Sequence, residues 1–279
     1  MSKRKLTLQH LMLFCEHLGR DEKSVATIEK YLRDTKMLQE YAEGHEITKE
    51  IIVMFKKELQ KKGYAVRSIN SMLASLNSLF SFLGWDDCKV KMLKIQQQIY
   101  CAEDKELTKA EYYRLLEASK KQVQLNLVIQ TICATGIRVS ELKYFTVEAV
   151  FCGEIVVRCK NKTRTILVPG ELKRLLLNYT KCHNIKRGII FITKKGSPLG
   201  RSNIWTQMKR LCAVAGVNPS KVFPHNLRKL FARTFYGIEK DIAKLADILG
   251  HSNINTTRIY IMETGVEHRR RIEQLGLVV

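Results

Sequence analysis

The sequence predicts a mainly α-helical chain with two domains: a helical first domain, and a mixed α+β second domain with a small antiparallel sheet. Three observations support this fold class. Apolar residues recur at helical spacing through residues 6–84, in stretches separated by glycines. One pair of adjacent segments between residues 154 and 168 is typical of a β-hairpin. The chain has 279 residues and 45% hydrophobic content, enough for two modest cores.

The first domain is predicted to contain four helices, at residues 6–18, 24–43, 48–62 and 66–83. A glycine follows each of them, and glycine accommodates the left-handed backbone that commonly ends a helix. Thr48 is a candidate N-cap of the third helix, because a threonine hydroxyl can accept a hydrogen bond from an N–H group of the first turn. We therefore expect a small four-helix unit at the start of the chain.

The domain boundary is placed where the periodic pattern weakens, in residues 85–106. We assign residues 1–98 to the first domain, 99–106 to a linker and 107–279 to the second domain. Thr108-Lys-Ala-Glu111 has the pattern of a capping box, in which the two side chains bond each other's backbone N–H groups. This motif predicts a helix at the start of the second domain.

The second domain contains two short β-rich segments, Glu154–Cys159 and Arg164–Val168. Lys160–Thr163 lies between them and forms a basic tip, so the pattern predicts a hairpin. A further short strand is expected at residues 189–192. The remaining elements are predicted to be helices, at residues 123–135, from Pro169 to Tyr179, and over most of the chain beyond Gly200.

The charge of the chain is strongly positive and unevenly distributed. With 48 Lys and Arg against 27 Asp and Glu, its formal net charge is +21. Residues 99–279 carry 31 basic and 15 acidic side chains, whereas residues 1–98 carry 17 and 12. A basic surface that only keeps the protein soluble is one explanation. The concentration of charge in the second domain favours a polyanionic partner, most often nucleic acid.

The cysteines and the apolar segments indicate where the protein resides. None of the eight cysteines forms a Cys-x-x-Cys pair, and no histidine stands beside them at zinc-ligand spacing. Free thiols in a reducing compartment are the expected state. The N-terminus has no signal-peptide pattern, and no apolar stretch approaches the length of a membrane span. We therefore expect a cytoplasmic protein with no membrane partner.

Two arginines, two histidines and a tyrosine stand in short segments of the second domain and would make a poor hydrophobic core. They are Arg138 in Ala-Thr-Gly-Ile-Arg-Val-Ser-Glu-Leu, His225 and Arg228 in His-Asn-Leu-Arg, His251 in Leu-Gly-His-Ser, and Tyr260. Together they suit attack on a phosphodiester. Arginine stabilises charge on phosphate oxygens, histidine moves protons, and tyrosine can serve as a nucleophile.

Each side chain has a predicted role in that reaction. Arg138 and Arg228 are the candidate phosphate ligands. His225 precedes Arg228 by three residues, so both can share one face of a helix. His251 is a candidate proton donor or acceptor, and nearby cations should favour the phenolate of Tyr260, the candidate nucleophile. At the hairpin tip, Lys160 is the candidate proton donor to the departing 5′ oxygen.

Taken singly, these residues also have structural explanations. Tyr260 stands between two isoleucines and could be a packed core tyrosine, and a lone histidine is more often structural. Arg138 could be the ion-pair partner of Glu141, and a lysine at a hairpin tip is usually solvated. The presence of the complete set in the more basic domain favours the catalytic interpretation.

The order of these residues resembles that of the tyrosine recombinase family, the phage integrases, which includes the Xer-type recombinases. The segment around Arg138 is similar to the family's first arginine box. Leu-Gly-His251-Ser, with Tyr260 nine residues after the histidine, is similar to its second box and nucleophile. The resemblance extends over residues 105–275, and the first domain is similar to the family's SAM-like, core DNA-binding domain. Many relatives have a glycine after the hairpin lysine, whereas Asn161 follows Lys160 here, so Lys162 remains an alternative acid.

The resemblance implies a mechanism and partners. Tyr260 would cleave a DNA strand to give a 3′-phosphotyrosine and a free 5′-hydroxyl. The 5′-hydroxyl of a partner strand would then attack the phosphotyrosine bond. The covalent link conserves the bond energy, so no ATP, metal or other cofactor is implied. The family acts on double-stranded DNA recombination sites as a homotetramer that holds two duplexes. Residues 261–279, including Val266 to Leu277, would form a tail helix of the kind that docks on a neighbouring subunit.

Two other functions are compatible with the same residues. One is a related enzyme, a type IB topoisomerase or a telomere resolvase, which would relax any supercoiled DNA or close hairpin ends instead of exchanging two specific sites. The other is a DNA-binding regulator with an inactive site. The complete residue set argues against the regulator.

Overall fold

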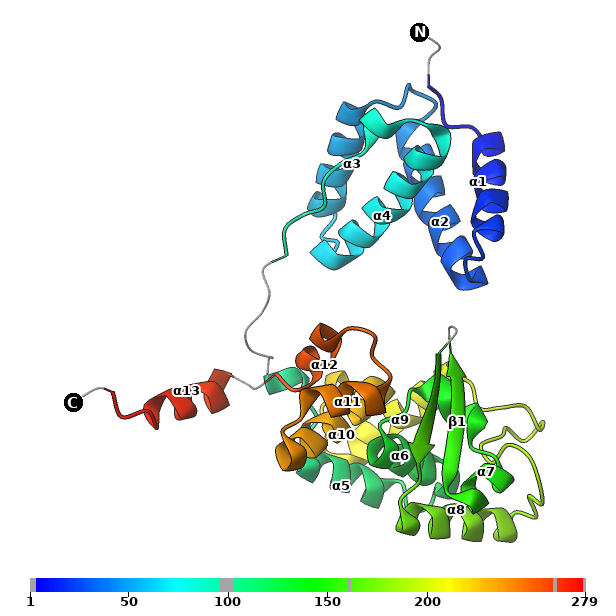
Figure 1. Ribbon diagram of the computed structural model, residues 1–279, viewed down its shortest axis with the longest axis vertical. Coiled ribbons are helices and arrows are strands. Elements are labelled where there is room, and N and C mark those ends of the chain that lie inside the picture. The colour runs from blue at the N-terminus through cyan, green and yellow to red at the C-terminus, as the bar shows by residue number, and fades with distance from the viewer. Residues whose placement is uncertain (1–3, 96–102, 160–161, 263–264, 278–279) are drawn as a thin grey trace. The chain divides into compact units, whose positions relative to one another are not determined.

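The chain forms two compact, mainly helical units, Met1–Gln97 and Gln98–Val279 (Figure 1). The computed structural model describes residues 4–95, 103–159, 162–262 and 265–277. Among them, the only sheet is a two-stranded antiparallel one in the second unit, and the predicted fold class is confirmed. The proposed linker 99–106 lies partly outside the described residues. None of the described helices is long and apolar enough to cross a membrane.

The first unit contains the four predicted helices. They are α1 (Leu8–Arg20), α2 (Val25–Ala42), α3 (Lys49–Lys61) and α4 (Val66–Leu83), followed by the short 3₁₀ helix η1 (Asp86–Cys88). Thr48 caps α3 as predicted, since its hydroxyl accepts a hydrogen bond of 3.4 Å from the N–H of Ile51. The apolar faces of the helices meet in one core, in which Phe14, Leu38 and Leu73 are fully buried.

One carboxylate is buried between two helices of this first unit. Asp34 on α2 accepts hydrogen bonds from the ammonium of Lys30, at 2.6 Å, and from the hydroxyl of Ser75 on α4, at 2.8 Å. Lys30 also donates to the carbonyl of Ser71 on α4, at 3.0 Å. A buried carboxylate needs such partners because it has lost its water. The group therefore ties α2 to α4.

The second unit begins with the helix that the capping box predicted. Thr108 accepts a hydrogen bond of 3.1 Å from the N–H of Glu111, whose carboxylate accepts one of 2.8 Å in return. The helices of this unit are α5 (Lys109–Ala118), α6 (Val123–Thr135), α7 (Val147–Cys152), α8 (Gly170–Cys182), α9 (Arg201–Ala215), α10 (Pro224–Glu239), α11 (Ile242–Leu249), α12 (Ile254–Tyr260) and α13 (Gly265–Glu273). Its 3₁₀ helices are η2 (Glu103–Lys105), η3 (Val139–Tyr144) and η4 (Pro219–Lys221).

The hairpin consists of β1 (Glu154–Cys159) and β2 (Lys162–Leu167), paired in a register that places Glu154 opposite Leu167 and Cys159 opposite Lys162. The second strand therefore begins two residues earlier than predicted, because Lys162 and Thr163 pair with β1 instead of forming the tip. The strand predicted at residues 189–192 is not formed. Ile189 and Ile192 make isolated bridges to two different partners, Thr146 and Pro198, so no continuous ladder develops.

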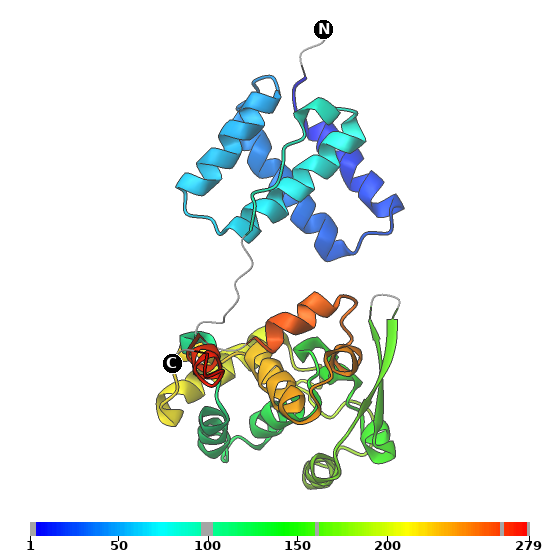
Figure 2. The ribbon, with the colours of Figure 1, turned by 60° about the vertical axis from the view of Figure 1, so that its left-hand side comes forward.

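The helices that carry the candidate residues pack around the end of α6. Gly136 ends α6 in a left-handed conformation with φ of +63°, and a Cβ at this position would lie 2.4 Å from the ring of Phe231 on α10. Only glycine allows that backbone and that approach. Next to this turn, Ala232, Leu245 and Leu249 form a small core with Tyr260. The free ends of β1 and β2 rise toward the same side of this unit as α12 (Figures 1 and 2).

Candidate active site

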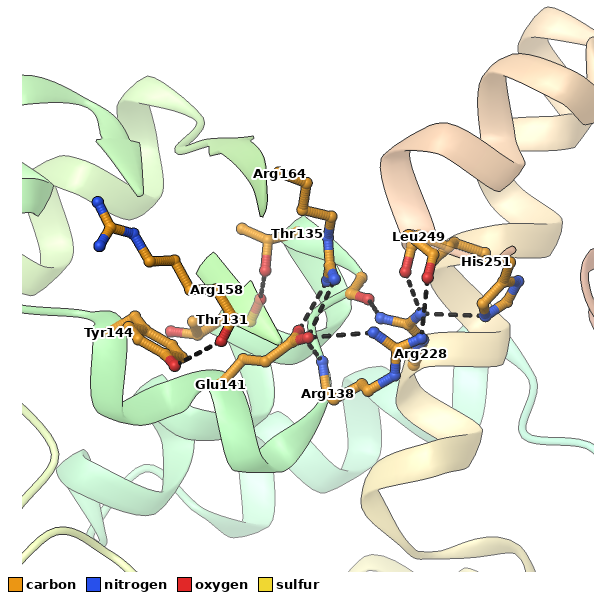
Figure 3. A network of polar contacts seen from close by, with 12 residues as sticks. Thr131, Thr135, Arg138, Glu141, Tyr144, Arg158, Arg164, Arg228, Leu249 and His251 are labelled. Atoms are coloured by element: carbon orange, nitrogen blue, oxygen red, sulfur yellow. Dashed lines mark hydrogen bonds and ion pairs between the residues drawn. The ribbon is translucent and has the colours of Figure 1, made fainter. Parts of the chain in front are cut away.

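The first arginine stands directly after the turn that ends α6. Arg138 is the N-cap of η3, and its guanidinium donates to Glu141 Oε1 at 3.1 Å and to the carbonyl of Gly250 at 3.2 Å (Figure 3). About a third of the side chain, 37%, stays exposed. Arg138 therefore has fixed partners on one side and remains accessible to a ligand.

Glu141 is buried beneath this arginine and has two cationic partners. Its side chain is only 2% exposed, and it accepts hydrogen bonds from the backbone N–H of Arg138, at 2.7 Å, and from both terminal nitrogens of Arg164 on β2, at 3.0 and 2.7 Å. Burial alone would raise the pKa of Glu141, but these hydrogen bonds and charges prevail and hold it below its ordinary value. The carboxylate is therefore ionised at neutral pH.

The second arginine is buried almost completely. Arg228 on α10 is 1% exposed and donates to the carbonyls of Gly136 and Leu249, the latter at 2.6 Å. Burial, and then the charge of Arg138, lower the pKa of Arg228 to about 10. The guanidinium thus stays charged at neutral pH, although carbonyl dipoles are its direct partners.

The hydrogen bonds of His251 define the tautomer of its ring. Arg228 Nη2 lies 3.1 Å from His251 Nε2, and because a guanidinium only donates, Nε2 must accept. The proton of a neutral ring is then on Nδ1, which lies 2.9 Å from the hydroxyl of the buried Thr257. Burial, and then the charges of Arg228 and Arg138, lower the pKa of His251 to about 4, which agrees with a neutral ring.

Tyr260 ends α12 with its ring between the two histidines. The ring centroids of His225 and His251 lie 5.0 and 4.9 Å from its own, and the Arg228 guanidinium carbon lies 6.0 Å from it. The tyrosine is 7% exposed. His225, on the first turn of α10, is exposed, yet the surrounding protein atoms, and then Lys229 and Arg228, lower its pKa. Both histidines beside the phenol therefore favour the neutral form.

The structure thus brings five of the six predicted residues together: Arg138, His225, Arg228, His251 and Tyr260. Lys160 lies outside the described residues. Its alternative, Lys162, is the first residue of β2. The ion pair between Arg138 and Glu141, expected as a structural alternative, exists in addition to the cluster and does not exclude Arg138 from it.

Two residues of the site were not among the predicted ones. Arg164 pairs with Glu141, and Thr257 bonds His251. Neither has a signal in the sequence, because an arginine in a strand and a threonine in a helix are ordinary surface residues unless their long-range partners are known. Glu141, noted only as a partner of Arg138, lies at the centre of the network.

The cluster contains side chains for two tasks of phosphodiester cleavage, which are stabilising the phosphate charge and activating the nucleophile. It combines two guanidiniums to hold a phosphate, a phenol to attack it and neutral imidazoles to accept a proton.

A family model described as "Phage integrase family" matches residues 105–265, and one described as "Phage integrase, N-terminal SAM-like domain" matches residues 11–87.

The chain belongs to the phage integrase family. Its relatives include the tyrosine recombinase XerA of Pyrococcus furiosus, which is 29% identical over 289 residues that cover 100% of this chain and 98% of the relative. The tyrosine recombinase XerD of Vibrio cholerae is 26% identical over 84% of each chain. The predicted resemblance to the tyrosine recombinases is confirmed.

Solved structures share the fold of this integrase-family chain. The XerH site-specific recombinase bound to difH substrate, in a pre-cleavage complex, matches with a TM-score of 0.70 and 20% identity over 96% of this chain and 84% of that one. A lambda integrase dimer bound to a COC′ core site matches with a TM-score of 0.73 and 17% identity, over 95% and 79%.

Proposed function

We propose that this protein is a site-specific DNA recombinase that cuts and rejoins strands through Tyr260. The phenolic oxygen attacks the scissile phosphorus, the bond to the 5′ oxygen breaks, and a 3′-phosphotyrosine and a free 5′-hydroxyl result. A 5′-hydroxyl from a partner strand reverses these steps and releases the tyrosine. The observation that carries the proposal is the position of Tyr260, with its ring about 5 Å from two imidazoles and 6.0 Å from the guanidinium carbon of Arg228.

The two arginines would stabilise the charge that builds on the non-bridging oxygens. Arg138 is the more accessible and would bind the phosphate directly. Arg228 is fixed by carbonyls and needs no reorganisation when the negative charge develops. Buried cations act strongly here because little water screens them.

His225 is the better candidate for the acceptor of the phenolic proton. Both ring nitrogens of His251 are engaged, Nε2 by Arg228 and Nδ1 by Thr257. His225 lies equally close to Tyr260, and its lowered pKa keeps the ring neutral at physiological pH, as a base requires. His251 would then orient Arg228 and donate to the phosphate once DNA displaces these contacts.

Double-stranded DNA is the proposed substrate, and a homotetramer on two duplexes the proposed assembly. The net charge of +21 supports a polyanionic partner, and the two relatives described above are named as tyrosine recombinases, which supports recombination over the topoisomerase, resolvase and regulator alternatives. Helix α13 and its flank expose apolar side chains that could dock on a neighbour: Val266, Ile272, Leu275 and Leu277. The reaction needs neither a metal nor another cofactor, and we place it in the cytoplasm.

The proposal is tested by trapping the covalent intermediate. The substrate is a duplex that carries a site selected from a random library by this protein. A nick close to the scissile phosphate makes the fragment with the free 5′-hydroxyl so short that it diffuses away after cleavage. We expect the wild-type protein to accumulate a covalent adduct, and Tyr260→Phe to bind the duplex with unchanged affinity and form none. Tyr236→Phe is the control, since this tyrosine on α10 packs against the same small core as Tyr260 but is not one of the candidate catalytic residues. A normal adduct yield from Tyr260→Phe would disprove the nucleophile.

Lys160 is proposed as the general acid, with Lys162 as the alternative. We expect Lys160→Ala to slow cleavage far more than Lys162→Ala. A duplex with a 5′-bridging sulfur has a leaving group that needs no acid, so it should restore the rate of Lys160→Ala. Rescue of Lys162→Ala alone would reverse the assignment.

A further inference from the structure

A salt bridge that the proposed chemistry does not use joins the hairpin to η3, beside a hydrogen bond of 2.7 Å from the hydroxyl of Tyr144 to the carbonyl of Arg158 on β1. Arg164 on β2 donates from both terminal nitrogens to the two oxygens of Glu141, at 3.0 and 2.7 Å (Figure 3). The arginine is 14% exposed and the glutamate 2%. A two-point pair of this kind fixes orientation as well as distance.

Arg164 also lies against the segment that leads into His251. Gly250 has a left-handed backbone with φ of +63°, and a Cβ there would lie 2.6 Å from Arg164 Nη1 and 2.9 Å from its Cδ. The carbonyl of the same glycine accepts the hydrogen bond from Arg138, at 3.2 Å. One guanidinium therefore contacts both partners of Arg138, the carboxylate and the glycine.

We propose that Arg164 is a positioning residue, which fixes Glu141 and Gly250 so that the guanidinium of Arg138 is aimed at the scissile phosphate. This inference rests on the proposed function. Arg164 is itself a poor phosphate ligand, because both terminal nitrogens are occupied and its Nε is buried. Without it, Glu141 keeps its bonds to Arg138 but loses the contact that fixes its own position.

The chain offers a matched control on its surface. Arg174 on α8 also pairs with a glutamate, because its Nε and Nη2 both donate to one oxygen, Oε2, of Glu171, at 3.2 and 2.8 Å. Its side chain is 61% exposed and its partner 81%. Arg174→Met removes the same charge and the same type of ion pair outside the cluster.

The test compares single-turnover cleavage of two selected duplexes, one with an ordinary scissile phosphate and one with a methylphosphonate, whose neutral group needs less help from Arg138. Misplacing a catalytic group by a small distance can cost about 100-fold in rate. We expect Arg164→Met to be slower by about 100-fold on the phosphate and by less than about 10-fold on the methylphosphonate. Arg164→Lys should show a smaller defect with the same pattern, and Arg174→Met none.

The pattern over the two substrates decides the inference. Equal slowing of Arg164→Met on both would mean general damage to the fold and would overturn it, as would an unchanged rate on the phosphate. Circular dichroism would show whether Arg164→Met folds. If it does not, the same comparison of slowing on the phosphate and on the methylphosphonate duplex is made with Arg164→Lys. An inactive wild-type protein would instead contradict the proposed function, so the two failures are distinguishable.

Discussion

A buried carboxylate in each unit of the molecule, Asp34 in the first and Glu141 in the second, is paired with cations, but the two groups have different surroundings. Asp34 in the first unit is 1% exposed and bonds a lysine and a serine that connect α2 to α4. Glu141 in the second unit is 2% exposed and bonds two arginines and a backbone N–H. Both groups hold secondary-structure elements together, but only Glu141 contacts a predicted catalytic residue.

The difference shows how burial of a similar charge serves stability in one place and chemistry in another. Around Asp34, the positive charge comes from the partly exposed Lys30, at 2.6 Å, and from the exposed Arg33, whose Nη2 lies 3.5 Å from the other carboxylate oxygen. Near Glu141, Arg138, Arg164 and the buried Arg228 stand close together, and they would repel one another without a central anion. Glu141 therefore makes it possible to assemble enough positive charge to bind a phosphate.

The largest effect is expected for Glu141→Gln, which keeps the shape but removes the anion. It leaves the neighbouring guanidiniums without their counter-charge, and breaking a buried ion pair typically costs about 3–5 kcal/mol. We expect the unfolding free energy of the second unit to fall by an amount of that order and cleavage to slow by about 100-fold. Thermal unfolding and single-turnover cleavage measure the two effects. If the variant is destabilised but its cleavage rate is unchanged, Glu141 contributes only to stability, as Asp34 does, and not to the chemistry.

A smaller effect, on stability alone, is expected for Asp34→Asn. The amide retains an oxygen for Ser75 but loses the charge that pairs with Lys30, so we expect a loss of about 1–3 kcal/mol. Hydrogen exchange in α2 and α4 should accelerate, while cleavage at saturating DNA stays within about twofold of wild type. A large loss of cleavage rate would show that the first unit acts on the chemistry through this contact.

The third effect is a gradual loss of stability as the pH falls. The pKa of His251 is lowered to about 4 in the folded protein, below its ordinary value of 6.5. As the pH falls, the imidazole therefore becomes protonated in the unfolded chain before it does so in the folded protein. Stability should therefore be complete above pH 6.5 and decline as the pH falls toward 4, by less than about 1.4 kcal/mol per pH unit from this group. The decline should be shallower in His251→Asn. Identical slopes for the two proteins, from thermal melts at pH 4.5–7, would contradict the assignment.

The elements with local signals were predicted well. The four helices of the first unit, the capping box at Thr108 and the hairpin all follow from short-range patterns, and the structure contains each of them, although α1 continues through Gly19 to Arg20 instead of ending at that glycine. The motif residues also converge, since Arg138, His225, Arg228, His251 and Tyr260 meet at the end of α6. These patterns express backbone preferences and chemistry that a few neighbouring residues determine.

The features that sequence reasoning missed depend on long-range contacts. Arg164 stands 23 residues from Glu141, and nothing in its strand distinguishes it from a solvated arginine. Ile189 and Ile192 look like part of a strand, but they bridge to separate segments. The buried state of Arg228 was equally invisible, because the two carbonyls that it contacts come from Gly136 and Leu249. Such contacts exist only once the helices have packed.

The most direct test of the central claim is to identify the residue that carries the DNA. The adduct formed on the nicked duplex would be digested with nuclease and trypsin, and the remaining nucleotide located by mass spectrometry. Trypsin cleaves after Arg258 and Arg269, so the peptide of residues 259–269 contains Tyr260 as its only tyrosine. We expect this peptide to carry the 3′-linked nucleotide. A nucleotide on any other peptide, with residues 259–269 unmodified, would contradict the account.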